Sequence, residues 1–219
     1  MSLAEDIDKR RLLVSMVFPL LFVALLWVVK LIETLSDTSF VQLGLYPLKA
    51  KGLPGIVFGP LLHGDWKHLF NNTFSLFFLS WAVFYFYHKV AWKAFFLIYF
   101  ISQFWLWFFA REAYHIGASG LIYGYGSFVF VSGILLKHRH LLAISLLVAF
   151  LYGSMVWGIL PVDEKVSWEG HLMGLIAGII LAVYYKDSGP VLPTQENDLE
   201  DEESDFEFEE YQEGEEKAS

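Results

Sequence analysis

Two polar residues lie in otherwise apolar stretches where they could act together as a nucleophile and a base. Ser119 lies between Gly117 and Gly120 at the start of one apolar run, and His171 lies near the start of another. A serine hydroxyl attacks a carbonyl carbon readily only when a base accepts its proton, and the histidine imidazole titrates near neutral pH. The pair therefore indicates acyl transfer by a Ser–His dyad.

A third apolar run begins with residues that could stabilise the oxyanion formed by such an attack. His68 and Asn72 are four positions apart, so they share a helix face, and both can donate hydrogen bonds. The backbone N–H of Ser119 is a further candidate donor. Tyr123, one helical turn after Ser119, could stack on His171. Because Glu169 is only two residues from His171, it does not share its helix face, and a dyad rather than a triad is predicted.

Each motif also has a purely structural interpretation. His68 and Asn72 could anchor a helix end at the membrane interface, and His171 could bond a backbone carbonyl. Gly120 and Gly124 form a small-residue motif that favours close helix packing. His63 precedes His68 by five positions without a third ligand nearby, so no metal site is predicted.

The composition indicates the environment in which these residues act. Of the 219 residues, 56% are hydrophobic and 18% are charged, against about 25% charged in an ordinary soluble domain. A water-soluble globular enzyme could not bury that much apolar surface. The absence of cysteine excludes disulfide scaffolds, cysteine proteases and iron–sulfur clusters. No basic patch runs through the chain, so no nucleic-acid partner is predicted.

Six apolar runs are long enough to cross a hydrocarbon core of about 30 Å. They cover residues 12–29, 66–87, 90–110, 119–136, 141–160 and 168–185. We therefore predict an all-α membrane protein of six transmembrane helices embedded in the lipid bilayer. Lysine and arginine are concentrated before the first run, in the second–third and fourth–fifth links, and after the sixth. This places both termini in the cytoplasm and a long loop, 36–65, on the outer side.

Depth and spacing relate the candidate residues to one another. In this orientation the helices that carry Asn72, Ser119 and His171 all enter from the outer side, and all three residues lie a few ångströms below that surface. Gly174 and Gly178, with Gly170, recur every four residues on one helix. They leave a smooth face that could press against the helix that begins at Ser119.

Taken together, these motifs resemble the rhomboid intramembrane serine proteases. The resemblance rests on His63, His68 and Asn72 in one run, Gly117-Ala118-Ser119-Gly120 in another, and the motif His171-x-x-Gly174-x-x-x-Gly178 in the last. It covers about residues 12–186.

The resemblance implies a role for each of these residues. Ser119 would be the nucleophile, His171 the general base, His68 and Asn72 the oxyanion donors, and Tyr123 the ring that stacks on His171. His63 would match an additional loop histidine, and Gly120, Gly174 and Gly178 would match positions of close helix packing. The substrates would be transmembrane proteins cut near the outer face, at small or helix-destabilising residues, without a metal or cofactor.

One departure from the family concerns the first loop. Many relatives carry a Trp–Arg pair there, whereas this chain has no arginine between Arg11 and Arg111. No seventh helix is apparent, which indicates the basic six-helix bacterial form and a bacterial plasma membrane.

The predicted organisation is a cytoplasmic N-terminus at 1–11, a six-helix protease domain at 12–186 and a tail at 187–219. Residues 196–219 hold 13 of the 24 acidic residues, so we expect a solvated, disordered cytoplasmic tail. A docking motif for an unknown cytoplasmic partner is the alternative reading of that tail.

Two other functions compete with proteolysis. A non-catalytic rhomboid-like protein would bind membrane helices for trafficking or degradation, but such relatives have usually lost the serine or the histidine. A channel or transporter would need a charged pathway across the bilayer, and the inner halves of these helices carry almost none.

Overall fold

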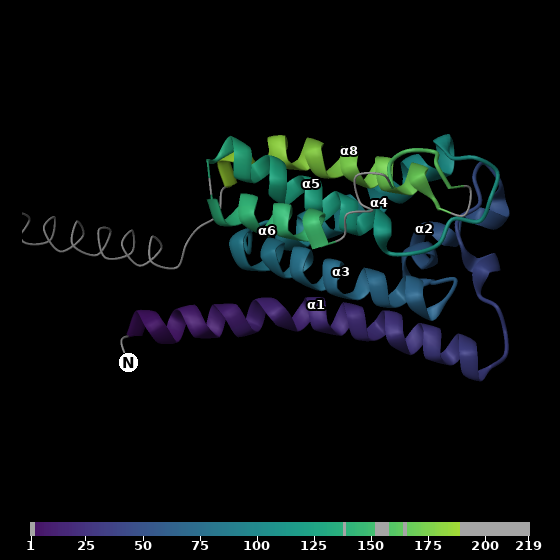
Figure 1. The fold of residues 1–219 in the computed structure, drawn as a ribbon, viewed down its shortest axis with the longest axis horizontal. Helices are drawn as coiled ribbons and strands as arrows, with labels where there is room; N and C mark the ends of the chain where they lie inside the picture. Colours follow the sequence, from purple (N-terminus) through teal and green to yellow (C-terminus); the bar gives the residue numbers. More distant parts are fainter. Residues whose placement is uncertain (1–2, 138, 152–157, 164–165, 189–219) are drawn as a thin grey trace, which may run out of the picture.

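The computed structural model describes residues 3–137, 139–151, 158–163 and 166–188, and within these residues the fold is helical (Figure 1). The longer helices are α1 (Leu3–Leu35), α3 (Trp66–Phe86), α4 (Ala91–Phe109), α5 (Ser119–Leu135), α6 (Arg139–Leu151) and α8 (Trp168–Tyr184). A short helix, α2 (Gly55–Phe58), lies in the loop that joins α1 to α3. The only extended pairing among the described residues is an isolated bridge between Leu45 and His115.

The predicted apolar runs and the observed helices differ most at α1. It was predicted over 12–29 but begins at Leu3 and ends at Leu35, because no helix-breaking residue follows Val29 until the chain turns at Asp37, whose φ is 48°. The other helices begin within two residues of their predicted starts. The predicted run 141–160 is helical as far as Leu151, and its next residues, 152–157, lie outside the described part.

Within the described residues, three helices are long and apolar enough to cross a membrane by length and composition: residues Lys9–Leu35 of α1, α3 and α4. The apolar helices α5 and α8 have 17 residues each, about 26 Å of rise. Exposed phenylalanines repeat every fourth position along α3 and α4, at Phe70, Phe74, Phe78, Phe96, Phe100 and Phe104. Such stripes suit contact with lipid. The count of six spans and the cytoplasmic termini stay predictions, and residues 189–219 of the predicted tail lie outside the described part.

Helix α5 occupies the centre of the bundle. It contacts α3, α4, α6 and α8, and its Tyr125 and Phe128 are fully buried. The contact between α5 and α8 is the closest because glycines line it. A Cβ atom added to Gly174 would overlap with the carbonyl oxygen of Gly120, and one added to Gly178 would overlap with that of Gly124. The two backbones therefore touch, as the glycine spacing predicted.

The opposite side of the bundle is built differently. Helix α1 packs chiefly against α3, and the first loop folds over the end of the bundle where α5 begins (Figure 1). Leu45 of that loop is fully buried, and its backbone exchanges hydrogen bonds of 3.0 and 2.8 Å with His115 in the α4–α5 connection. The first loop is thereby attached to the segment that leads into Ser119.

Candidate active site

Ser119 and His171 meet where α5 and α8 begin. His171 Nε2 lies 2.8 Å from Ser119 Oγ, and His171 Nδ1 lies 2.7 Å from the carbonyl oxygen of Gly158. A carbonyl oxygen only accepts hydrogen bonds, so Nδ1 carries the proton and Nε2 can accept from the serine hydroxyl. This is the protonation pattern that a general base requires.

The Tyr123 ring fixes the plane of the imidazole. Its centroid lies 4.3 Å from that of His171, with an angle of 13° between the rings. Together with the bond to Gly158, this stacking leaves the imidazole little freedom to rotate.

His68 and Asn72 lie next to Gly117, two residues before Ser119. Gly117 has a φ of +112°, and a Cβ atom there would lie 2.7 Å from His68 Cε1 and 3.8 Å from Asn72 Nδ2. Only glycine allows this approach, because it lacks a Cβ and tolerates positive φ. All four side chains, His68, Asn72, Ser119 and His171, line one pocket of about 480 Å³.

Asp65 caps the N-terminus of α3. Its Oδ1 accepts a hydrogen bond of 2.8 Å from the backbone N–H of His68. That bond holds the pKa of the Asp65 carboxyl below its usual value. The cap fixes the first turn of α3 and therefore the position of His68 within it.

His63 does not line the pocket but lies against the two candidate donors. Its Nε2 is 3.0 Å from Asn72 Nδ2, and its ring centroid is 4.9 Å from that of His68. The side chain is 2% exposed, and burial lowers the pKa of His63 to about 3, with the charge of His68 as a smaller cause. His63 is therefore neutral at pH 7, and its Nε2 accepts a hydrogen bond from the Asn72 amide.

Comparison with known proteins identifies the family. A family model described as Rhomboid domain matches residues 51–188. The chain belongs to the rhomboid family. An uncharacterized protein of Mycobacterium tuberculosis is 38% identical over 173 residues, which is 74% of this chain and 72% of that protein. An uncharacterized protein of Mycobacterium leprae is 36% identical over 192 residues, 81% of this chain and 74% of that protein. No solved structure matches the chain.

The rhomboid resemblance seen in the sequence is therefore confirmed, while the six-helix form stays a prediction. The family match and the apolar helices make this chain an integral membrane protein. Among the described residues, no group of three or more His, Cys, Asp and Glu side chains is placed to hold a metal ion.

An ion pair that was not among the predicted site residues ties α8 to the segment before Ser119. Arg111 Nη1 lies 2.9 and 2.8 Å from the two carboxylate oxygens of Glu169, and Arg111 Nη2 donates to the carbonyl oxygen of Val166. Next to it, His115 Nδ1 lies 2.7 Å from Ser167 Oγ. The signal was present: Glu169 is an acid in the first turn of an apolar helix, where an unpaired charge is costly.

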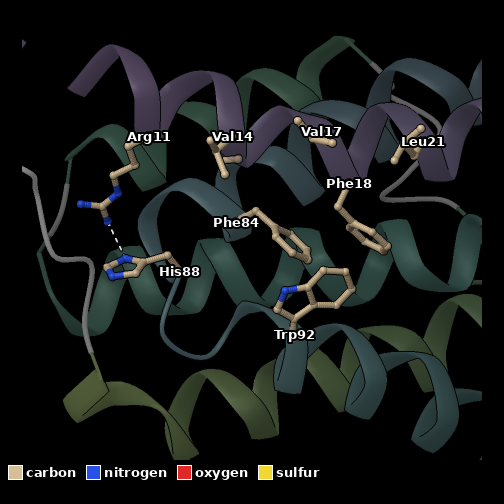
Figure 2. A pocket seen from close by; sticks show the side chains of 9 residues that line it. Arg11, Val14, Val17, Phe18, Leu21, Phe84, His88 and Trp92 are labelled. Carbon is tan, nitrogen blue, oxygen red and sulfur yellow. Dashed lines mark hydrogen bonds between the residues drawn. The ribbon is translucent and has the colours of Figure 1, made fainter. Parts of the chain in front are cut away.

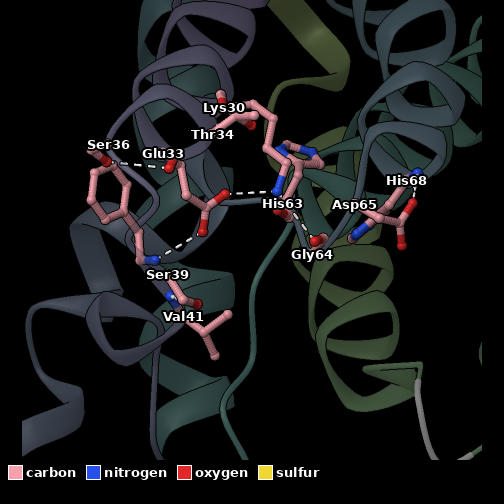
Figure 3. Close-up of polar contacts among 11 residues, drawn as sticks. Lys30, Glu33, Thr34, Ser36, Ser39, Val41, His63, Gly64, Asp65 and His68 are labelled. Carbon is pink, nitrogen blue, oxygen red and sulfur yellow. Dashed lines mark hydrogen bonds and ion pairs between the residues drawn. The ribbon is translucent and has the colours of Figure 1, made fainter.

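A second ion pair, also absent from the predicted site, joins the C-terminal end of α1 to the first loop. Lys30 Nζ lies 2.7 Å from Glu33 Oε2, and it donates to the carbonyl oxygens of His63 and Gly64 (Figure 3). The first loop of this rhomboid lacks the Trp–Arg pair that many relatives carry. Lys30 and Glu33 supply polar contacts to the loop from outside it.

A larger pocket, of about 640 Å³, lies between α1, the end of α3 and the start of α4 (Figure 2). It is lined mostly by apolar side chains, and Arg11 Nη2 contacts His88 Nδ1 at 2.7 Å at one end. Ser15 also lines it, but Ser15 Oγ donates to the carbonyl oxygen of Leu12 and accepts from Trp81. The smaller pocket, which holds Ser119 and His171, is therefore the candidate active site.

Proposed function

We propose that this rhomboid is an intramembrane serine endopeptidase that hydrolyses peptide bonds in or near transmembrane segments of membrane proteins. The observation that carries the proposal is the 2.8 Å contact between Ser119 Oγ and His171 Nε2 in a pocket that also holds His68 and Asn72. The family is generally one of intramembrane serine proteases, which supports the same reaction class.

In the first half of the reaction, Ser119 Oγ attacks the carbonyl carbon of the scissile peptide bond. His171 Nε2 accepts the hydroxyl proton, and the carbonyl oxygen becomes an oxyanion. The Asn72 amide, the His68 ring and the backbone N–H of Ser119 donate hydrogen bonds to that oxyanion. When the tetrahedral intermediate collapses, the C–N bond breaks and His171 returns the proton to the leaving amine.

In the second half, water attacks the acyl-enzyme ester. His171 Nε2 accepts a proton from that water and then returns it to Ser119 Oγ as the carboxylate product leaves. Throughout, Gly158 and Tyr123 hold the imidazole in the orientation that both steps need. The close glycine contacts at Gly120, Gly174 and Gly178 hold α5 and α8 at the distance the dyad requires.

The membrane setting completes the proposal. The six helices would span a bacterial plasma membrane with both termini in the cytoplasm, and the pocket would open toward the outer side. Substrates would be transmembrane proteins whose helices unwind locally at small or helix-destabilising residues. The tail beyond residue 188 lies outside the described part, and a cytoplasmic partner for it stays a prediction.

The test is cleavage of a model transmembrane substrate by the full chain reconstituted in lipid vesicles. We expect wild-type protein to cut the substrate, and Ser119→Ala and His171→Ala to lose cutting while keeping the wild-type melting temperature. Stable binding of the substrate helix by wild-type protein, without turnover, would favour the non-catalytic rhomboid-like function instead. Cutting of the substrate by Ser119→Ala would contradict the mechanism, because this variant lacks the attacking hydroxyl.

A further inference from the structure

Lys30 is a buried lysine that belongs to no part of the proposed dyad or oxyanion hole. It is 8% exposed and lies near the outer end of α1. An ammonium group has three hydrogens to donate, and Lys30 Nζ has three acceptors: Glu33 Oε2 at 2.7 Å, the His63 carbonyl oxygen at 2.9 Å and the Gly64 carbonyl oxygen at 3.2 Å (Figure 3). All three N–H groups of the Lys30 ammonium are therefore used in contacts with Glu33 and with the end of the first loop.

Glu33 extends the contact to the other end of the same loop. Its Oε2 binds Lys30, and its Oε1 accepts a hydrogen bond of 2.8 Å from the backbone N–H of Phe40. Phe40 follows the end of α1, and His63 and Gly64 directly precede the cap of α3. The ion pair therefore fixes the beginning and the end of the first loop to one point on α1.

From this point a short chain of contacts leads to the candidate active site. Lys30 holds the backbone carbonyl of His63, and the ring of the same residue accepts a hydrogen bond of 3.0 Å from Asn72 Nδ2. An amide nitrogen carries two hydrogens, so the one bound to His63 sets the direction of the other. In the proposed mechanism that second hydrogen binds the oxyanion.

We propose that Lys30 and Glu33 are positioning residues of the active site, which act through His63 on the orientation of the Asn72 amide. This inference rests on the proposed function, since it assigns the ion pair a part in the same reaction. Neither residue lines the pocket that holds Ser119 and His171.

The burial of the pair argues against a role in stability alone. The side chains of Lys30 and Glu33 are 10% and 12% exposed. Replacing a buried ion pair by apolar residues of similar size is often neutral or stabilising, because both charges must be desolvated. What an apolar pair could not do is hold two carbonyl oxygens and an N–H group in place. Charge-assisted hydrogen bonds are also shorter and stronger than neutral ones, which suits a positioning contact.

The test compares two variants in two backgrounds. Lys30→Met/Glu33→Gln removes both charges, keeps an acceptor for the N–H of Phe40 and releases the carbonyl oxygens of His63 and Gly64. Trp27→Phe is the matched control: it removes a different polar contact of α1, the 3.0 Å bond from Trp27 Nε1 to Thr73 Oγ1 on α3, which does not involve the loop. Both are made in the wild-type chain and in Asn72→Ala.

A misdirected oxyanion donor costs less than a missing one, whose loss typically slows an enzyme by about 10²- to 10³-fold. We therefore expect Lys30→Met/Glu33→Gln to lower kcat about tenfold with KM unchanged, and Trp27→Phe to lower it less than about twofold. In the Asn72→Ala background the double substitution should cause no further loss, since the amide on which it acts is gone. Equal losses in the two backgrounds would overturn the inference, as would an unchanged kcat in the wild-type background.

A second variant and a wild-type control separate failure of this inference from failure of the proposed function. If the double variant does not fold, Lys30→Gln serves instead, because it keeps a donor for Glu33 while removing the ammonium from the two carbonyls. Failure of the wild-type chain to cleave any substrate or to react at Ser119 would overturn the proposed function and this inference together. Normal cleavage by the wild-type chain with no dependence on Lys30 would overturn the inference alone.

Discussion

The two sides of the candidate active site are held by different kinds of contact. Ser119 and His171 stand at the ends of α5 and α8, whose backbones touch at Gly120 and Gly174. Asn72, by contrast, is oriented through His63, a loop residue whose backbone is held by Lys30. The nucleophile and base therefore depend on backbone packing, whereas the Asn72 amide depends on a relay through Lys30 and His63. Substitutions that separate α5 from α8 should therefore remove nearly all cleavage. Substitutions in the relay to Asn72 should lower cleavage by degrees.

The largest expected effect comes from breaking the backbone contact. Gly174→Ala places a Cβ atom on the carbonyl oxygen of Gly120, so α5 and α8 must move apart. We expect cleavage to fall at least about 100-fold and the melting temperature to drop, because overpacking a core contact typically costs about 1–3 kcal/mol. Ile180→Ala, at a position on α8 that is 51% exposed, is the control and should keep activity. Wild-type cleavage by Gly174→Ala would show that the dyad does not need this contact.

The next effect comes from removing an oxyanion donor. Asn72→Ala should lower kcat by about 10²- to 10³-fold with little change in KM, since the lost hydrogen bond forms only in the transition state. Thr73→Val is the neighbouring control on α3, because Thr73 faces Trp27 instead of the pocket. Steady-state cleavage in vesicles measures both. A loss that appears in KM alone would move Asn72 from the chemistry to substrate binding.

A smaller effect is expected at the ion pair that ties α8 to the segment before Ser119. Arg111→Met leaves the carboxylate of Glu169 buried without its bidentate partner, so both the melting temperature and cleavage should fall, the latter about tenfold. Arg111→Met/Glu169→Gln removes the stranded charge and should recover most of the melting temperature. If the double variant melts below the single one, the ion pair is not what fixes the start of α8.

The smallest effect is expected at the exposed contact between α1 and α3. Trp27→Phe removes one hydrogen bond at the surface, and such substitutions usually change stability by less than about 0.5 kcal/mol. Activity and melting temperature should stay within error of the wild type. A large loss of activity would mean that α1 is held to α3 through Trp27, and that Lys30 does not act alone in linking α1 to the site.

The same contrast separates what the sequence predicts from what it does not. Ser119, His171 and the glycines at Gly174 and Gly178 are visible because polar residues are costly in apolar helices and because glycine recurs every four positions. Tyr123 follows from helical spacing alone. These features are local, so a single sequence is enough to find them.

The relay that starts at Lys30 and Glu33 and the Arg111–Glu169 ion pair are not local. Lys30 and Glu33 resemble an ordinary pair of surface charges at a helix end, and nothing in their spacing indicates contact with His63. Arg111 and Glu169 are far apart in the chain, so only the fold brings them together. The end of α1 was also missed, because the uncharged run stops at Val29, before Lys30, whereas the helix continues to Leu35.

The most direct test of the central claim is the reaction of Ser119 with a serine-directed fluorophosphonate, with the adduct located by mass spectrometry. The account predicts labelling of folded wild-type protein at Ser119 and its loss in His171→Ala, because only the dyad activates this hydroxyl. Labelling at Ser119 that persists in His171→Ala, or labelling at another serine, would contradict it.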